Sequence, residues 1–138
     1  MSAKNFFACS QFAVVGASTN PTKFGHKVLK AYIDGGRTVV GINPNASSIA
    51  GAPCLPSLDK LKDPTQTAVS IVTPPAVTLT VLEQAAQLGV QHVWCQPGSE
   101  DEAVVERAKS LKIPLIYGGP CVLIDLPKFS PPSNESSL

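Results

Sequence analysis

The chain has 138 residues, of which 43% are hydrophobic and 15% charged, and its formal net charge at pH 7 is +1. This length suits one domain, and the near-neutral charge argues against a surface for nucleic acid or anionic membranes. No apolar run approaches the roughly 18 residues that a membrane span needs, and we expect no signal peptide. The 4 cysteines are widely spaced, with no Cys-x-x-Cys pair. That spacing argues against a zinc site or a disulfide framework and favours free thiols in the cytoplasm.

Short β-rich runs alternate with helical stretches along the chain. We expect strands at residues 12–16, 38–42, 68–73, 91–96 and 113–117, and helices at 22–34, 57–61, 74–89 and 99–111. The segment after the second strand carries Gly51, Pro53 and Pro56 and is predicted to be a loop. Ser99-Glu-Asp-Glu102 has the spacing of a capping box, which predicts that Ser99 caps the last helix.

Repeated strand–helix units predict a parallel sheet with helices on both faces, because each right-handed crossover covers one face. We therefore expect an α/β fold in one domain: a three-layer, doubly wound, Rossmann-like arrangement around a mostly parallel, five-stranded sheet. Residues 1–8 are expected to form an N-terminal extension, 9–128 the domain and 129–138 a disordered tail.

The junction after the first predicted strand is the clearest candidate for a binding site. The strand ends at Gly16-Ala17-Ser18, and a helix follows within a few residues. Free N–H groups and the positive end of a helix dipole make such a junction suitable for a phosphate, and Ser18, Thr19 and Lys23 would add donors. We expect a valine at position 16 to leave the domain folded but to block the approach of the phosphate to the backbone.

The other predicted strands end in similar residues, and ligands of doubly wound sheets bind at these carboxyl ends. Small residues and prolines occupy them, with no side chain typical of catalysis. Any strand–helix turn favours such residues, but their presence at every strand end favours a shallow binding cleft over an active site. The ends are Gly16-Ala17-Ser18, Asn43-Pro44-Asn45, Thr73-Pro74-Pro75, Gln96-Pro97-Gly98 and Gly118-Gly119-Pro120-Cys121.

An NAD-dependent enzyme is the main alternative. Its fingerprint requires Gly-x-Gly-x-x-Gly and an acidic residue at the end of the second strand. Here the glycine that follows Gly16 is Gly25, and the second strand ends at the neutral Asn43. Both departures count against NAD. No nucleophile–base set, acid/base pair or metal-ligand cluster emerges, so the sequence favours a binding module.

Several short motifs extend over most of the chain: Val14–Ser18, Asn20-Pro21 with Lys23-Phe24-Gly25, Gly41–Pro44, Ile49–Gly51, Ser57-Leu58, Ile71–Pro75 and Val93–Gly98. Together they resemble the CoA-binding domain family over residues 8–126. This Rossmann-like module occurs in small stand-alone proteins and in the α subunit of succinyl-CoA synthetase.

The resemblance implies coenzyme A or an acyl-CoA as the ligand, with its pyrophosphate at the Gly16–Ser18 loop and the following helix. The Asn43 and Thr73 turns would border the adenosine and pantetheine portions. The candidate ligand-binding residues are Gly16, Ala17, Ser18, Thr19, Lys23, Phe24, Gly25, Asn43, Pro44, Thr73, Pro74, Pro75, Gln96, Pro97 and Gly98.

Two positions depart from the family pattern. Members often have a lysine where this chain has Asn45, and an aspartate where it has Gly119. Lys23 and Arg37 are candidate substitutes for the missing cation.

Three functions follow from these expectations. The first is a CoA-binding sensor, carrier or regulatory module without catalysis of its own, acting in the cytoplasm, alone or with a protein partner or a second copy. The second is an NAD(P)-dependent enzyme or a detached subunit of a CoA ligase. The third is a protein with a vestigial site that works through protein contacts.

Two further residues, His26 and Cys121, are open to two interpretations each. His26 is expected to face solvent, with donation to the ligand as the alternative. Cys121 is expected to be structural, with a redox role near the pantetheine end as the alternative. Cys95 and Trp94 are expected in the core.

Overall fold

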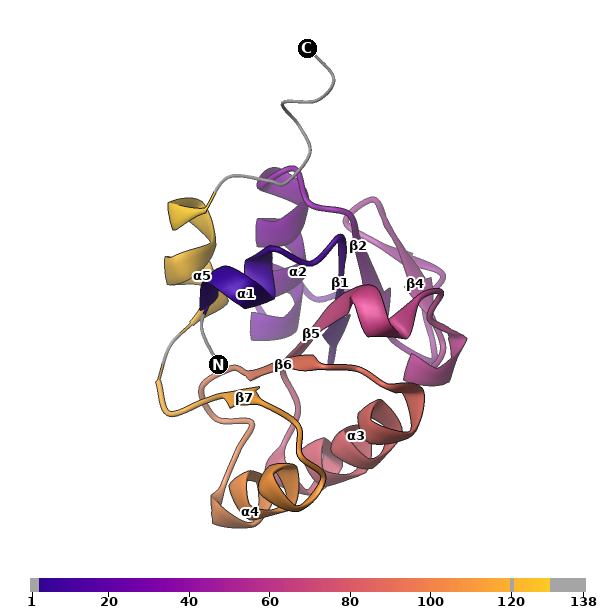
Figure 1. Ribbon diagram of the computed structural model, residues 1–138. Coiled ribbons are helices and arrows are strands. Elements are labelled where there is room, and N and C mark those ends of the chain that lie inside the picture. The colour runs from indigo at the N-terminus through magenta and orange to yellow at the C-terminus, as the bar shows by residue number, and fades with distance from the viewer. Residues whose placement is uncertain (1–2, 120, 130–138) are drawn as a thin grey trace.

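The computed structural model describes residues 3–119 and 121–129 (Figure 1). None of the helices within these ranges is long and apolar enough to cross a bilayer. The helices are α1 (Ala3–Phe7), α2 (Phe24–Asp34), α3 (Pro75–Leu88), α4 (Glu102–Ser110) and α5 (Val122–Asp125), with 3-10 turns at Leu58–Lys60, Pro64–Gln66 and Leu126–Lys128. The strands are β1 (Gln11–Val15), β2 (Val39–Ile42), β3 (Ser48–Ile49), β4 (Ala52–Leu55), β5 (Thr67–Ile71), β6 (His92–Cys95) and β7 (Leu115–Ile116).

The strands form one 7-stranded sheet in the order β3-β4-β2-β1-β5-β6-β7. All neighbours are parallel except β3 and β4. The chain runs outward from β1 through β2 and β4, then crosses back to β5 on the other side of β1. The strand order therefore reverses between β1 and β5, and this reversal is where doubly wound sheets bind ligands.

The prediction of a mostly parallel α/β sheet is confirmed, but the expected number of five strands is wrong. The segment predicted to be a loop forms the hairpin of β3 and β4, and β4 extends the sheet beside β2. Ala50 and Gly51 turn this hairpin with φ angles of +53° and +91°, the positive values of a tight hairpin turn. The two strands are short and contain Pro53, so they lack the alternation that marks longer strands.

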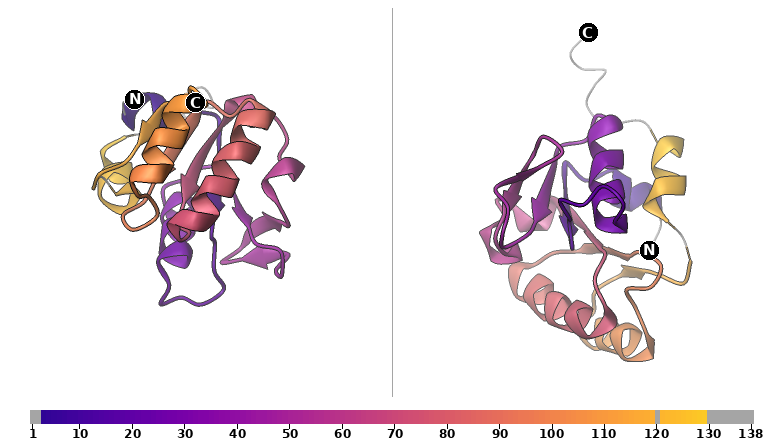
Figure 2. Two further views of the ribbon diagram at one scale, coloured as in Figure 1. Left: turned by 90° about the horizontal axis from the view of Figure 1, so that it is seen from below. Right: turned by 180° about the vertical axis from the view of Figure 1, so that it is seen from behind.

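Helices cover both faces of the sheet, as Figures 1 and 2 show: α1, α2 and α5 lie on one face, and α3 and α4 on the other. The alternation of side chains along β1 supplies both cores. Phe12 and Val14 pack toward α2, whereas Ala13 and Val15 pack toward α3. The three-layer arrangement therefore follows from strands that are apolar on both faces.

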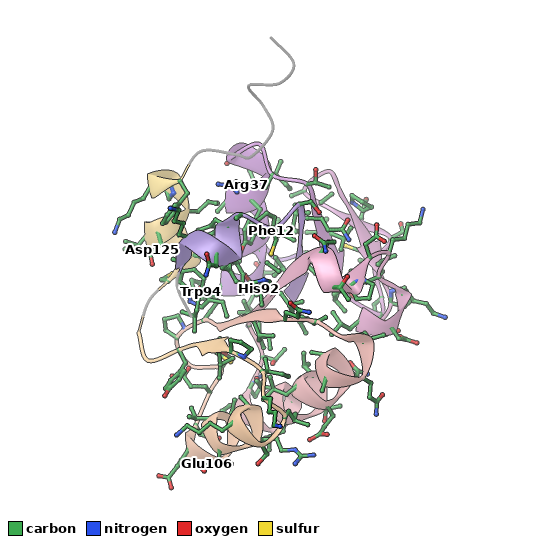
Figure 3. The ribbon with its side chains drawn as sticks, in the orientation of Figure 1. Phe12, Arg37, His92, Trp94, Glu106 and Asp125 are labelled. Atoms are coloured by element: carbon green, nitrogen blue, oxygen red, sulfur yellow. The ribbon has the colours of Figure 1, made fainter. Side chains whose placement is uncertain are left out.

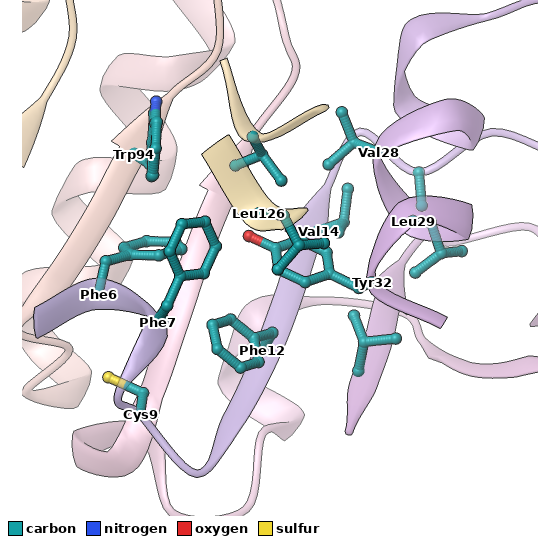
Figure 4. Close-up of a cluster of buried hydrophobic side chains, with 14 of the residues drawn as sticks. Phe6, Phe7, Cys9, Phe12, Val14, Val28, Leu29, Tyr32, Trp94 and Leu126 are labelled. Atoms are coloured by element: carbon teal, nitrogen blue, oxygen red, sulfur yellow. The ribbon is translucent and has the colours of Figure 1, made fainter. Parts of the chain in front are cut away.

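The N-terminal segment packs into the same core as α2 and α5. Phe6 and Phe7 of α1 are buried, and their ring centroids lie 5.2 and 5.5 Å from that of Trp94 (Figure 4). The prediction that Trp94 is a core residue is confirmed. Of the expected tail at 129–138, only Phe129 lies within the described residues, and its ring centroid is 5.1 Å from that of Phe7.

The start of α4 differs from the predicted capping box. The helix begins at Glu102, and its N-cap is Asp101, whose carboxylate accepts a hydrogen bond from the Val104 N–H at 3.0 Å. Ser99 lies earlier in the turn and donates its hydroxyl to the carbonyl of Gln96 at 2.7 Å. The prediction that Ser99 is the cap is wrong because the helix begins only at Glu102, so Ser99 lies two residues before the N-cap.

Candidate ligand-binding site

Gly16 lies where the end of β1 touches the end of β5. Its φ is +93°, and a Cβ added there would lie 2.1 Å from the carbonyl oxygen of Val72. The adjacent Val72 N–H donates to the carbonyl of Val15 at 2.8 Å. A valine at position 16 would therefore strain the fold itself, so its effect on binding would not isolate the ligand site. Its Cβ would overlap the backbone after β5 rather than the space for a ligand.

Gly25 brings the start of α2 against this same loop. A Cβ on Gly25 would lie 2.0 Å from the carbonyl oxygen of Gly16. The helix N-terminus can approach the strand end this closely only because residue 25 has no side chain. Two glycines thus set the distance between the loop and the positive end of the α2 dipole.

Two side chains hold the carbonyl groups of the loop after Gly16. The Asn43 amide donates to the carbonyl of Ala17 at 3.0 Å, and the amide oxygen of Asn43 accepts from the Asn45 N–H at 2.7 Å. The Nδ1 of His26 lies 2.9 Å from the carbonyl oxygen of Ser18. A carbonyl oxygen only accepts, so Nδ1 carries the hydrogen. The expectation that His26 faces solvent is wrong, because the side chain is partly buried against the loop.

The rest of the loop is closed by its own side chains. The Asn20 N–H donates to the Ser18 hydroxyl at 3.1 Å, and the Thr22 N–H donates to the Asn20 amide oxygen at 3.0 Å. By contrast, five N–H groups around the loop donate to no acceptor within the part of the chain that the structure describes: those of Ala17, Ser18, Thr19, Phe24 and Gly25. Free N–H groups at a strand–helix junction favour an anion.

Two hollows lie at the carboxyl ends of the strands. One, of about 400 Å³, is lined by Phe24, Val72, Thr73, Pro74, Pro75, Pro97, Gly98 and Ser99. The other, of about 460 Å³, is lined by Asn43, Pro44, Asn45, Ala46, Ser47, Cys54 and Pro56. Volume alone does not select them, since a hollow of about 480 Å³ lies between α2 and the chain after α5. The two hollows are candidates because they lie at the carboxyl edge of the sheet, where doubly wound sheets bind ligands.

The structure thus brings most of the predicted site residues to one edge. Lys23 is exposed and is the N-cap of α2. Gln96 differs from the others: it is fully buried, and its side-chain oxygen accepts from the Val122 N–H at 2.9 Å. Within the described part of the chain, its side-chain nitrogen has no hydrogen-bond partner. Sequence reasoning did not single out the other lining residues, which are Val72, Ala46, Ser47, Ser99, Cys54 and Pro56.

Arg37 lies at the opposite end of the sheet, between α2 and β2, close to Phe12 (Figure 3). It is 7% exposed, and its guanidinium donates to the carbonyls of Phe7 at 2.7 Å and Phe129 at 2.9 Å. The expectation that Arg37 replaces a phosphate-binding lysine is therefore wrong, and Lys23 is the candidate that lies at the carboxyl edge of the sheet.

Within residues 3–119 and 121–129, no group of three His, Cys, Asp or Glu side chains could hold a metal ion. All four cysteines are free thiols. Cys95 is fully buried, as expected for a core residue, and burial raises its pKa to about 12. Its thiol is therefore unsuited to nucleophilic chemistry at neutral pH, whereas Cys121 is partly exposed just before α5.

Comparisons with known proteins agree on one kind of domain. The family described as "CoA binding domain" matches residues 10–127. ADP-forming acetate–CoA ligase I of Archaeoglobus fulgidus is 31% identical over 97 residues, which are 70% of this chain and 14% of the ligase.

Two solved structures extend this likeness. A conserved hypothetical protein from Pyrococcus furiosus has a TM-score of 0.78 at 32% identity, over 83% of this chain and 97% of that one. The dinucleotide-forming acetyl-coenzyme A synthetase 1 of Ca. Korarchaeum cryptofilum, in complex with phosphate and ADP, has a TM-score of 0.73 at 28% identity, over 86% of this chain and 27% of that one. The chain thus spans only a small part of the ligase and the synthetase.

Proposed function

Because this chain belongs to the CoA binding domain family, we propose that it binds coenzyme A or an acyl-CoA at the carboxyl edge of its sheet. The observation that carries the proposal is the group of free N–H donors at the loop after β1. These donors lie where the strand order reverses. One hollow lies at the carboxyl ends of β5 and β6, and the other at that of β2, on the other side of β1. An elongated ligand with a central pyrophosphate fits such an edge.

The parts of the ligand can be assigned by chemistry. The pyrophosphate would accept from the N–H groups of residues 17–19 and from the start of α2, with the exposed Lys23 as a neighbouring cation. The adenosine portion would lie in the hollow bordered by Asn43 and Pro44, and the pantetheine arm in the hollow bordered by Thr73 and Pro97.

The protein would act through binding rather than catalysis, as a sensor, carrier or regulatory module. The described residues provide a binding edge, without a metal site or a reactive buried thiol. A second candidate function is a detached subunit of a CoA ligase, which the ligase-type relatives favour. The two differ in one respect: a detached subunit would need a separate catalytic partner.

Calorimetric titration with CoA, acetyl-CoA, NAD and NADP tests the proposal. We expect saturable binding of CoA or acetyl-CoA but not of NAD or NADP. A ligand at 100 times its Kd should stabilise the fold by about 2.7 kcal/mol, which a thermal melt detects as a higher Tm. Stabilisation by NAD alone, or no response to any of the four at millimolar concentration, would contradict CoA binding.

A further inference from the structure

We infer that Asn43 and His26 are positioning residues, which hold the peptide groups after Gly16 so that successive N–H donors face the phosphate of the ligand. This inference rests on the proposed function, and it assigns a role to two side chains that need not touch the ligand. Both belong to other elements than the loop: Asn43 follows β2, and His26 lies in the first turn of α2.

The geometry of the peptide bond supports this role. A trans peptide is planar, so the carbonyl of one residue and the N–H of the next point in opposite directions. The described residues contain no cis peptide bond. Asn43 holds the carbonyl of Ala17, so the N–H of Ser18 points away from β2. In the same way, the His26 bond to Ser18 turns the N–H of Thr19 away from α2.

The preceding peptide group follows the same pattern. The carbonyl of Gly16 lies against the Cα of Gly25, where even an added Cβ would be only 2.0 Å away. The N–H of Ala17 therefore points away from α2 as well. Three successive peptide groups thus turn their carbonyls toward other elements, and their N–H groups have no acceptor among the described residues, so they remain available to an anion.

Loss of either side-chain bond would free a peptide group to rotate. A rotated peptide would present its carbonyl oxygen to the phosphate, replacing an attraction with a repulsion. Since hydrogen bonds to a charged group are among the stronger ones in proteins, we expect at least about a tenfold loss of affinity for CoA per lost bond. The loop is exposed at Thr19 and Asn20, so the fold itself should tolerate the change.

Variants of His26 test whether the position of its side-chain nitrogen determines the affinity for CoA. The side-chain nitrogen of asparagine can stand where Nδ1 of histidine stands, whereas that of glutamine is one bond further out. We therefore expect His26→Asn to keep the affinity for CoA within about threefold, and His26→Gln and His26→Ala to lose at least about tenfold. The Tm of each ligand-free variant reports whether it is folded.

Variants of Asn43 test the second bond. Asn43→Asp keeps the shape and still accepts from the Asn45 N–H, but a carboxylate cannot donate to the carbonyl of Ala17. Asn45→Asp adds the same charge on the same turn and leaves that bond in place, so it measures the effect of charge alone. We expect the loss of CoA affinity to be clearly larger for Asn43→Asp.

Amide NMR provides a readout that a purely structural role would not change. In the ¹⁵N-labelled protein, CoA should shift the Ser18 and Thr19 amide signals, and the Thr19 shift should be absent in His26→Gln and restored in His26→Asn. Failure of the unmodified protein to bind CoA would overturn the proposed function. Binding of CoA with unchanged Ser18 and Thr19 signals, or equal affinities for His26→Gln and His26→Asn, would overturn the positioning role alone.

Discussion

Gly16 is subject to two constraints, which a comparison with Gly51 can separate. Its φ of +93° disfavours any side chain, and its missing Cβ makes room for the carbonyl of Val72. Gly51 shares the first constraint, with a φ of +91°, but nothing lies within 4 Å of where its Cβ would be. The pair therefore distinguishes backbone conformation from steric overlap.

We expect Gly51→Ala to lower the free energy of unfolding by about 1–2 kcal/mol, the usual cost of a left-handed residue with a side chain. Gly16→Ala should lower it by about 2–5 kcal/mol, because the cost of forcing atoms into packed backbone adds to the same strain. Urea unfolding of both variants measures the difference. Equal losses would mean that the ends of β1 and β5 can separate without cost.

At the scale of the elements, the N-cap of α4 gives a direct prediction. Asp101→Ala removes the acceptor for the Val104 N–H, so it should lower the free energy of unfolding by about 1 kcal/mol, while Asp101→Ser should retain most of the stability. Glu106→Ala on the same helix removes an exposed side chain, 3.7 Å from Lys109, and should change stability by less than about 0.5 kcal/mol. Urea unfolding measures these changes. If Asp101→Ser lowered the free energy of unfolding as much as Asp101→Ala, the assignment of Asp101 as the N-cap would be refuted.

The predicted elements differ in how strongly the local sequence marks them. The runs that became β1, β5 and β6 are apolar on both faces, so composition alone marks them as buried parallel strands. β3 has two residues and β4 contains Pro53, and such strands exist only because β2 offers a free edge. Their prediction requires the tertiary structure, not the local pattern.

The same distinction applies to the candidate site. Glycines and prolines at the strand ends marked its location, because turns in parallel sheets need them. The roles of Asn43 and His26 were not predictable, since each depends on a hydrogen bond to a carbonyl group of another element. Nothing in the sequence around Arg37 distinguishes a buried structural guanidinium from a phosphate-binding one.

At the scale of the whole molecule, Arg37 joins the two ends of the described chain. Its guanidinium carbon lies 5.5 Å from the centre of the Phe7 ring and 5.6 Å from that of Phe12, and it donates to carbonyls of Phe7 and Phe129. The contacts with Phe7 hold α1, and the hydrogen bond to Phe129 holds the segment after α5. One side chain therefore fastens both terminal segments to β1, far from the candidate ligand edge.

Arg37→Ala should lower the free energy of unfolding by about 2–4 kcal/mol, because two carbonyls lose a charged donor and two rings lose a stacked cation. Hydrogen exchange should reveal the coupling: amides of α1 and of the Leu126–Lys128 turn should lose protection together, while those of β5 decrease only with global stability. Lys30→Ala, which breaks an exposed pair with Asp34 at 2.8 Å, is the control and should have little effect. Loss of protection at only one end in Arg37→Ala would show that the two terminal segments are held independently. CoA binding should survive in this variant, because Arg37 is remote from the loop after β1.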